Sequence, residues 1–201
     1  MNTPTPMRVQ AVTLSGHHVR LEPLALEHVG ALAEVGIDPV LWRHVPTQVA
    51  SAADMRAYVE TALAEQARGV SLPFAIVERA GGRVIGSTRY GNIVPEHRRL
   101  EIGWTWLTPS AQRTGANTGA KLLLLTHAFE TLGANRVELK TDALNAQSRA
   151  AILRIGAKEE GTFRQHMVIA DTGRIRDTVY FSIIRAEWPA VKANLEARLK
   201  R

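Results

Sequence analysis

The chain has 201 residues, of which 45% are hydrophobic and 22% charged, and these proportions exclude a disordered or collagen-like protein. It contains no cysteine, which excludes a disulfide framework, a thiolate metal site and a cysteine nucleophile. The formal net charge is +6, but the arginines are scattered and only Arg98 and Arg99 are adjacent, so charge alone favours a solvated surface over a nucleic-acid-binding face.

The length predicts one domain with short terminal appendages. We expect a disordered tail over residues 1–12, an α/β domain over residues 13–186 and an amphipathic C-terminal helix over residues 187–201, with Pro189 in its first turn. No apolar run approaches the roughly 18 to 20 residues of a membrane span. Residues 1–20 also contain no signal-peptide core, so we expect a cytoplasmic protein.

The first half of the chain predicts one strand and two helices, followed by a meander of strands. The residues from Val19 to Leu24 are typical of a strand, and Ser51 is suited to cap the second helix. Gly103 lies inside the last strand of the meander, where a glycine indicates a bulge or a close backbone approach. The predicted elements are strand 19–24, helix 26–34, helix 52–63, and strands 74–78, 84–93 and 100–106.

The second half alternates helices and strands and predicts a mixed α/β fold. Gly133 and Gly156 are placed to end the two helices before them. The predicted elements are helix 118–132, strand 137–141, helix 145–155, and strands 162–169 and 176–184 around a turn at Asp171-Thr172-Gly173.

The segment between the third meander strand and the helix after it is suited to bind an anion. A loop of small residues, 112–119, leads into a helix whose first N–H groups have no helical partner. Such helix starts bind phosphate groups, and Arg113 and Lys121 would add positive charge. The loop matches neither the Walker A motif nor the three-glycine dinucleotide motif, and the alternative is a simple turn.

Four segments in order resemble the GCN5-related N-acetyltransferases, the GNAT superfamily, and in particular the RimJ/RimL type that acetylates ribosomal-protein N-termini. Glu101-Ile-Gly-Trp-Thr-Trp-Leu107 resembles the fourth strand of that family, and Gln112-Arg-Thr-Gly-Ala-Asn117 resembles its pyrophosphate loop. Asn145 to Ala157 resembles its next helix, and Asp177 to Ser182 its last core strand. The resemblance spans His17 to Trp188.

The resemblance implies a mixed, mostly antiparallel sheet of about seven strands flanked by helices, with a cofactor cleft where the fourth and fifth strands splay apart. The implied cofactor is acetyl-CoA. Its pantetheine arm would lie beside Trp104, Trp106 and Leu107, and its pyrophosphate beside the helix start. The residues assigned to the pyrophosphate loop are Gln112, Arg113, Thr114, Gly115, Ala116, Asn117 and Thr118.

The same resemblance assigns Asn145, Ser148 and Arg154 to the far side of the cofactor. Alternatively, Asn145 is only a helix N-cap and Ser148 a packed small residue. Asn117 stands where the family loop usually has Gly or Ala, and Ala157 replaces the usual Phe. Ile152 stands where many relatives have the Tyr that protonates the leaving thiolate, which leaves Ser148 as the candidate acid.

Amine acetylation requires a neutral amine and a route for its proton. We assign Glu101 as the base, acting through a water, because it shares a strand with the expected thioester site. A strand amide near Trp106 would polarise the thioester carbonyl. The alternative for Glu101 is an ion-paired carboxylate, and His44 and His97 are alternative bases.

The acceptor side is assigned to Trp42, Arg43 and Tyr90, although Trp42 lies in an expected ordered loop, 38–46, and would equally suit the core. We expect an acetyl-CoA-dependent N-acetyltransferase whose partner is a small-molecule or peptide amine. No metal spacing is present, no membrane or nucleic-acid partner is expected, and a homodimer is left open. The alternatives are a non-catalytic acyl-CoA sensor on the same fold and, from the charge alone, a nucleic-acid-binding protein.

Overall fold

The structure is a computed structural model that describes residues 6–169 and 172–200. Its strands form one mixed sheet in the order β1-β2-β3-β4-β5-β6-β8-β7, in which β5 and β6 are the parallel pair and the other neighbours are antiparallel. The strands are β1 (Leu14–Ser15), β2 (Val19–Pro23), β3 (Leu72–Glu78), β4 (Val84–Val94), β5 (Arg99–Leu107), β6 (Arg136–Asp142), β7 (Lys158–Val168) and β8 (Ile175–Ile184).

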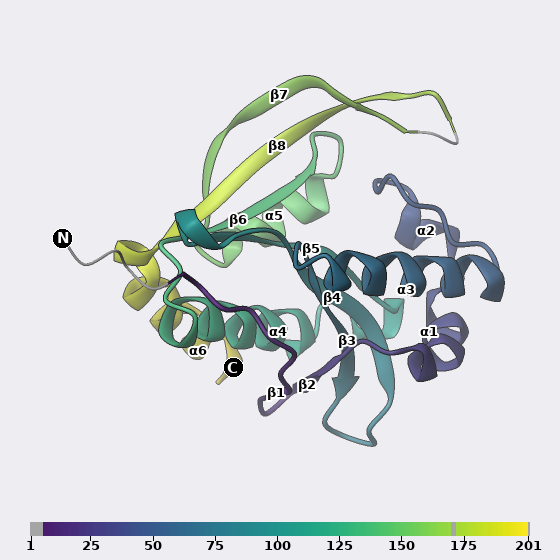
Figure 1. Ribbon diagram of the computed structural model, residues 1–201, viewed down its shortest axis with the longest axis horizontal. Helices are drawn as coiled ribbons and strands as arrows, with labels where there is room; N and C mark the ends of the chain where they lie inside the picture. The colour runs from purple at the N-terminus through teal and green to yellow at the C-terminus, as the bar shows by residue number, and fades with distance from the viewer. Residues whose placement is uncertain (1–5, 170–171, 201) are drawn as a thin grey trace.

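Helices cover both faces of this sheet (Figure 1). One hydrophobic core lies under α4 and α6 and includes Leu124, Phe181 and Leu195, and the second lies under α1 and α3 and includes Leu32 and Met55. The helices are α1 (Val29–Gly36), α2 (Pro39–Trp42), α3 (Ala52–Ala67), α4 (Gly115–Thr126), α5 (Ala146–Arg154) and α6 (Trp188–Leu199), and a π-helical turn over His127–Thr131 extends α4.

The fold class is confirmed: the protein is a mixed α/β structure with one mostly antiparallel sheet flanked by helices. The sheet has eight strands rather than about seven, because the two-residue β1 pairs with β2 at the edge. Helix α4 begins at Gly115, three residues before the expected start, because Thr114 caps it by accepting a hydrogen bond from the Ala116 N–H. The loop expected over residues 38–46 contains the short helix α2, capped by Asp38.

Both expected appendages pack against the domain. Met7 is only 3% exposed and belongs to the core under α4, with Val9 and Val12 against it, whereas residues 1–5 of the expected tail lie outside the described residues. The Trp188 ring of α6 stacks on Phe129 at a centroid distance of 5.4 Å. Burial of these apolar side chains makes both segments part of the core, which differs from the expected boundaries at residues 12 and 187.

The hairpin of β7 and β8 arches away from the helices, and its tip extends toward the side of the molecule where α2 lies (Figure 1). Strand β7 is an edge strand with mostly exposed side chains. Asp171, in the expected turn between these strands, lies outside the described residues. In the described part of the chain, no helix is both long and apolar enough to cross a membrane.

Candidate active site

Strand β5 bulges at the position that the sequence indicated. Ser87 of β4 pairs with Trp106, but Arg89 pairs with Gly103, so β5 has one more residue than β4 between the two pairs. The backbone at Trp104 adopts a left-handed conformation with φ +49°, which is uncommon for a non-glycine residue. The bulge is therefore confirmed, with the unusual φ at Trp104 rather than at Gly103.

Strands β5 and β6 separate directly after Glu101. Their parallel pairing joins Arg99 to Arg136, Leu100 to Val137 and Glu101 to Glu138 and then ends, although β5 continues to Leu107. The residues from Gly103 to Thr105 are half-buried, whereas their neighbours on both sides are buried. The splay between the family's fourth and fifth strands thus occurs between β5 and β6, and it leaves one backbone edge of β5 unpaired beyond Glu101.

The start of α4 lies just beyond the end of β5. After the Thr114 cap, the N–H groups of Gly115 and Asn117 have no acceptor within the helix. These free N–H groups form the positive end of the helix dipole. Arg113 precedes the cap in a left-handed conformation with φ +61° and is exposed. A Cβ at Gly115 would lie 2.7 Å from the ring of the exposed His18, so a larger residue here would have to displace that ring.

Helix α5 begins on the opposite side of the splay. The side-chain oxygen of Asn145 accepts a hydrogen bond of 2.9 Å from the Ser148 N–H, so Asn145 is an N-cap, as the structural alternative for this residue predicted. The half-buried Ser148 lies in the first turn of this helix. Gln112 donates to the Leu107 carbonyl (3.0 Å) and accepts from Gln147 (3.3 Å), so its side chain joins the end of β5 to α5.

Glu101 is 2% exposed and held by two neighbours on one of its oxygens. Asn92 Nδ2 donates to Oε2 at 2.7 Å, and Lys140 Nζ lies 3.0 Å from the same atom. The other oxygen, Oε1, points at the bulge, since it lies 2.8 Å from where a Cβ on Gly103 would be. Glu101 is therefore the ion-paired carboxylate of the alternative prediction, and it also presents an oxygen to the splayed part of β5.

Two cations flank the ring of Trp104. The Arg89 guanidinium lies 4.9 Å from the ring centroid and the Lys140 ammonium 5.7 Å from it. Arg89 also forms a 2.9 Å ion pair with Glu65 of α3. Sequence reasoning missed Arg89 and Lys140. The available signal was alternation, because both lie on strands next to β5 and point to the face that carries Glu101 and Trp104.

The sequence predicted that Lys121 would add positive charge to the anion-binding loop, 112–119, but its side chain points to strand β5 instead. Its ammonium donates a 2.7 Å hydrogen bond to Thr105 Oγ1, which also lies 2.8 Å from Thr88 Oγ1. Burial lowers the pKa of Lys121 to about 7. Lys121 therefore supports β5 beside the bulge from the α4 side and adds no charge to the loop.

The structure corrects two of the three acceptor residues. Tyr90 is fully buried and its hydroxyl donates to the Leu124 carbonyl at 2.5 Å, so it is a core residue under α4. Trp42 is also buried: its indole N–H donates to the Gly36 carbonyl, and its ring packs 5.5 Å from Trp106. Arg43 is exposed.

Several side chains of the expected cofactor set are likewise directed into the protein. The side chains of Trp106 and Leu107 are buried in the two cores, so these residues can offer only their backbone to a ligand. Ala116 and Thr118 are also buried, whereas Arg154 is exposed on the last turn of α5. In the described ranges, no group of three or more His, Asp or Glu side chains is arranged to hold a metal ion.

Comparison with known proteins decides the family. The model of the acetyltransferase (GNAT) domain family matches residues 18–158 of this chain. The chain belongs to the GNAT acetyltransferases. A solved GCN5-related N-acetyltransferase from Brucella melitensis is 33% identical, with a TM-score of 0.88 over 98% of this chain and 89% of its own.

Two further proteins are similar to this chain, one in sequence and one in fold. The Bacillus subtilis (strain 168) protein named "Putative ribosomal N-acetyltransferase YdaF" is 35% identical over 111 residues, 55% of this chain, and the match spans only 59% of that relative. Mycobacterium smegmatis RimJ, solved in complex with CoA-disulfide, shares the fold at 22% identity, with a TM-score of 0.78 over 94% of this chain and 95% of its own. The resemblance to the family is confirmed, and GNAT acetyltransferases are acyltransferase enzymes.

Proposed function

We propose that this GNAT protein transfers an acetyl group from acetyl-CoA to a primary amine, by direct attack in a complex that holds both substrates, and that it is of the RimJ/RimL type. The observation that carries the proposal is the splay of β5 from β6 directly beyond Glu101, with the starts of α4 and α5 on either side. The name of the Bacillus subtilis relative supports an amine of protein origin, and a small-molecule amine is also included in the proposal.

The residues of the splay fit coenzyme A. An extended amide chain such as the pantetheine arm requires an unpaired strand edge, and β5 has one from Gly103 to Leu107. A pyrophosphate requires unpaired N–H groups, which the start of α4 supplies at Gly115 and Asn117. Bound acetyl-CoA would supply an activated acyl group as a thioester.

We assign Glu101 as the base that accepts the proton of the amine. The contacts from Asn92 and Lys140 fix the orientation of the carboxylate, while Oε1 is left toward the bulge. As the amine nitrogen bonds to the acetyl carbon, its proton passes to Glu101 through a water, and the carbon–sulfur bond breaks. Ser148, in the first turn of α5, would give a proton to the departing sulfur.

The decisive experiment measures thiol release from acetyl-CoA with a panel of amines, amino acids and peptides. An acetyltransferase releases thiol only when an acceptor amine is present, and the acetylated amine appears in equal amount. Melting temperatures in acetyl-CoA, NAD and ATP provide the binding control, because a specific ligand stabilises the folded state. A large shift with acetyl-CoA but no turnover with any amine would favour the sensor, and equal shifts with all three would indicate only polyanion binding.

A further inference from the structure

Besides Arg99 and Arg136, which pair with Glu138 and Glu160, the sheet face that carries Glu101 and Trp104 carries four buried or half-buried cations. Three of them have a carboxylate partner: Arg89 pairs with Glu65, Lys140 with Glu101, and Arg174 with Asp142. The fourth, Arg176 of β8, has no carboxylate within 4.0 Å among the described residues. This group of side chains therefore has one more positive charge than negative charges, four against three.

Arg176 is deeply buried for a guanidinium without an ion pair. The residue is 5% exposed, and its Nε has no hydrogen-bond partner in the described part of the chain. Its hydrogen bond from Nη1 to the His44 carbonyl is long at 3.5 Å. A buried charge without compensation destabilises the folded protein. Burial accordingly lowers the pKa of Arg176 and Arg174 lowers it further, whereas Asp142 and Glu101 raise it.

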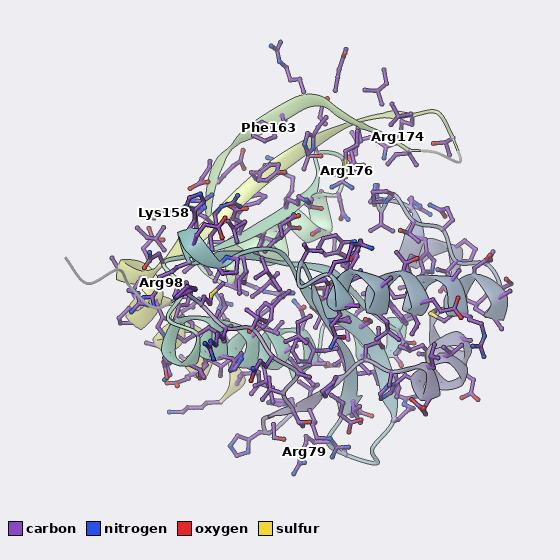
Figure 2. All side chains as sticks on the ribbon, viewed as in Figure 1. Arg79, Arg98, Lys158, Phe163, Arg174 and Arg176 are labelled. Atoms are coloured by element: carbon purple, nitrogen blue, oxygen red, sulfur yellow. The ribbon has the colours of Figure 1, made fainter. Side chains whose placement is uncertain are left out.

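The position of Arg176 suits a substrate contact rather than a contact with the cofactor. It extends from β8 to the segment after α2, under the β7–β8 hairpin (Figure 2). Tyr180 lies on the same face of β8, since side chains two residues apart point the same way, and its ring contacts Lys140, the partner of Glu101. In the described ranges, the contacts of Arg176 include none with the start of α4, the helix start that fits the pyrophosphate of coenzyme A.

We infer that Arg176 binds a carboxylate of the acceptor, and that this protein acetylates amines that carry a carboxylate near the amino group. The inference rests on the proposed function. A carboxylate is the group that fits best, because it matches the planar guanidinium with two parallel hydrogen bonds and supplies the missing negative charge. The carboxylate is either the α-carboxylate of a free amino acid or the side chain of an acidic residue near the N-terminus of a peptide.

The test compares acceptors that differ only in that group. Alanine is compared with alaninamide, and peptide amides that begin with Ser-Asp or Ser-Glu are compared with those that begin with Ser-Asn or Ser-Gln. We expect the carboxylate member of one pair to have a kcat/KM at least tenfold above its carboxamide, and the pair that shows this identifies the source of the carboxylate. Equal kcat/KM values within both pairs would overturn the inference while leaving acetyl transfer intact. No turnover with any amine would instead contradict the proposed function.

Variants of Arg176 provide the second readout. Arg176→Gln should lower kcat/KM for the preferred carboxylate at least tenfold and change it less than twofold for the matched carboxamide. Arg164→Gln, on the exposed strand β7, is the matched control and should preserve the preference. An equal loss for both members of the pair would make Arg176 a structural link between β8 and the α2 segment. If Arg176→Gln does not fold, Arg176→Lys decides, because it keeps the charge but loses the two-bond geometry and should reduce the preference alone.

Discussion

Glu101 combines two properties that a sequence pattern cannot separate. It is buried and ion-paired, as a structural carboxylate would be, and one of its oxygens faces the bulge at Gly103. A general base requires such orientation, whereas a purely structural ion pair does not. Activity measurements on a near-isosteric variant therefore distinguish the two roles.

Glu101→Gln should lower the acetylation rate about 10²–10⁴-fold, because the amide keeps the shape of the side chain but does not take a proton. The loss should be smallest at high pH, where the amine is already neutral. A pH–rate profile with one accepted amine measures both effects. Glu138→Gln is the matched control, since Glu138 pairs with Glu101 across β5 and β6 but forms its ion pairs with Arg99 and Arg136. A Glu101→Gln enzyme with the parent rate at every pH would leave His44 and His97 as candidate bases.

Lys121 makes stability depend on pH in a direction opposite to that of a salt-bridged lysine. Its pKa is about 7 in the folded protein, against a usual value near 10.4, so between these values the unfolded chain binds the extra proton. The free energy of unfolding then rises with pH across this window, by about 1.4 kcal/mol per unit. Lys121→Met should therefore be most stabilising at pH 7, and its advantage should shrink toward pH 10.

Urea unfolding at pH 7, 8, 9 and 10 measures this difference. Lys192→Met is a suitable control, because a hydrogen bond to Glu130 raises the pKa of Lys192. The stability that Lys192 contributes is fully present below its unfolded pKa near 10.4 and is lost only as pH rises through the folded value, so the Lys192→Met difference should stay constant from pH 7 to 9. If the Lys121→Met difference is also constant there, the buried amine does not titrate in the window.

At the scale of elements, the start of α4 determines where an anion is able to approach. The sequence motif suggests that Gly115 is required by the cofactor, but its missing Cβ would point at the His18 ring of the neighbouring segment. The glycine then serves the packing between the helix start and residue 18.

Gly115→Ala should lower both the melting temperature and the affinity for acetyl-CoA, because the new methyl group displaces the helix start from His18. His18→Ala combined with Gly115→Ala should recover both quantities, since it removes the ring that the methyl group meets. Thermal unfolding and calorimetric titration measure them, and His18→Ala alone is the control. A double variant that is stable but still does not bind acetyl-CoA would show that the ligand itself requires glycine.

Individual elements were predictable where their signals are local. Alternation identified β4 and β5, and Ser51 identified the start of α3, because pleat and capping act within a few residues. The short helix α2 was missed, since its four residues have no periodicity to detect. The edge strand β1 was missed for a similar reason, because its pairing depends on the neighbouring β2.

At the scale of the whole molecule, α6 belongs to the core of the domain. Trp188 is buried, stacks on Phe129 and donates to Glu130 at 2.8 Å. Trp188→Ala should therefore lower the free energy of unfolding by about 3–5 kcal/mol. Chemical denaturation measures the change, with Glu196→Ala on the exposed face of α6 as the control. A loss below about 1 kcal/mol would restore the view of α6 as an appendage.

The homodimer that the sequence left open stays a prediction, as does the cytoplasmic location. Many charged side chains form ion pairs, including Arg136 with Glu160 and Arg149 with Glu159. The preference for a solvated surface over a nucleic-acid-binding face also stays a prediction.

By itself the sequence indicated the family and determined the order of the longer elements, the bulge in β5 and the two helix starts that face the splay. These features depend on short-range patterns, in which a strand, a cap or a loop is specified by adjacent residues. For the same reason Asn145 was recognisable as an N-cap, because its side chain accepts a hydrogen bond from the N–H of Ser148, only three residues later.

Only the tertiary structure decided which side chains face the site. Trp42 and Tyr90 had suitable chemistry for substrate but point into the cores, whereas Arg89, Lys140 and Arg176 reach the site from separate elements. Their contacts join residues far apart in the chain, 24 positions for Arg89 and Glu65 and 132 for Arg176 and His44. Such pairs have no local signature, because they arise when the sheet and the hairpin bring distant strands onto one face.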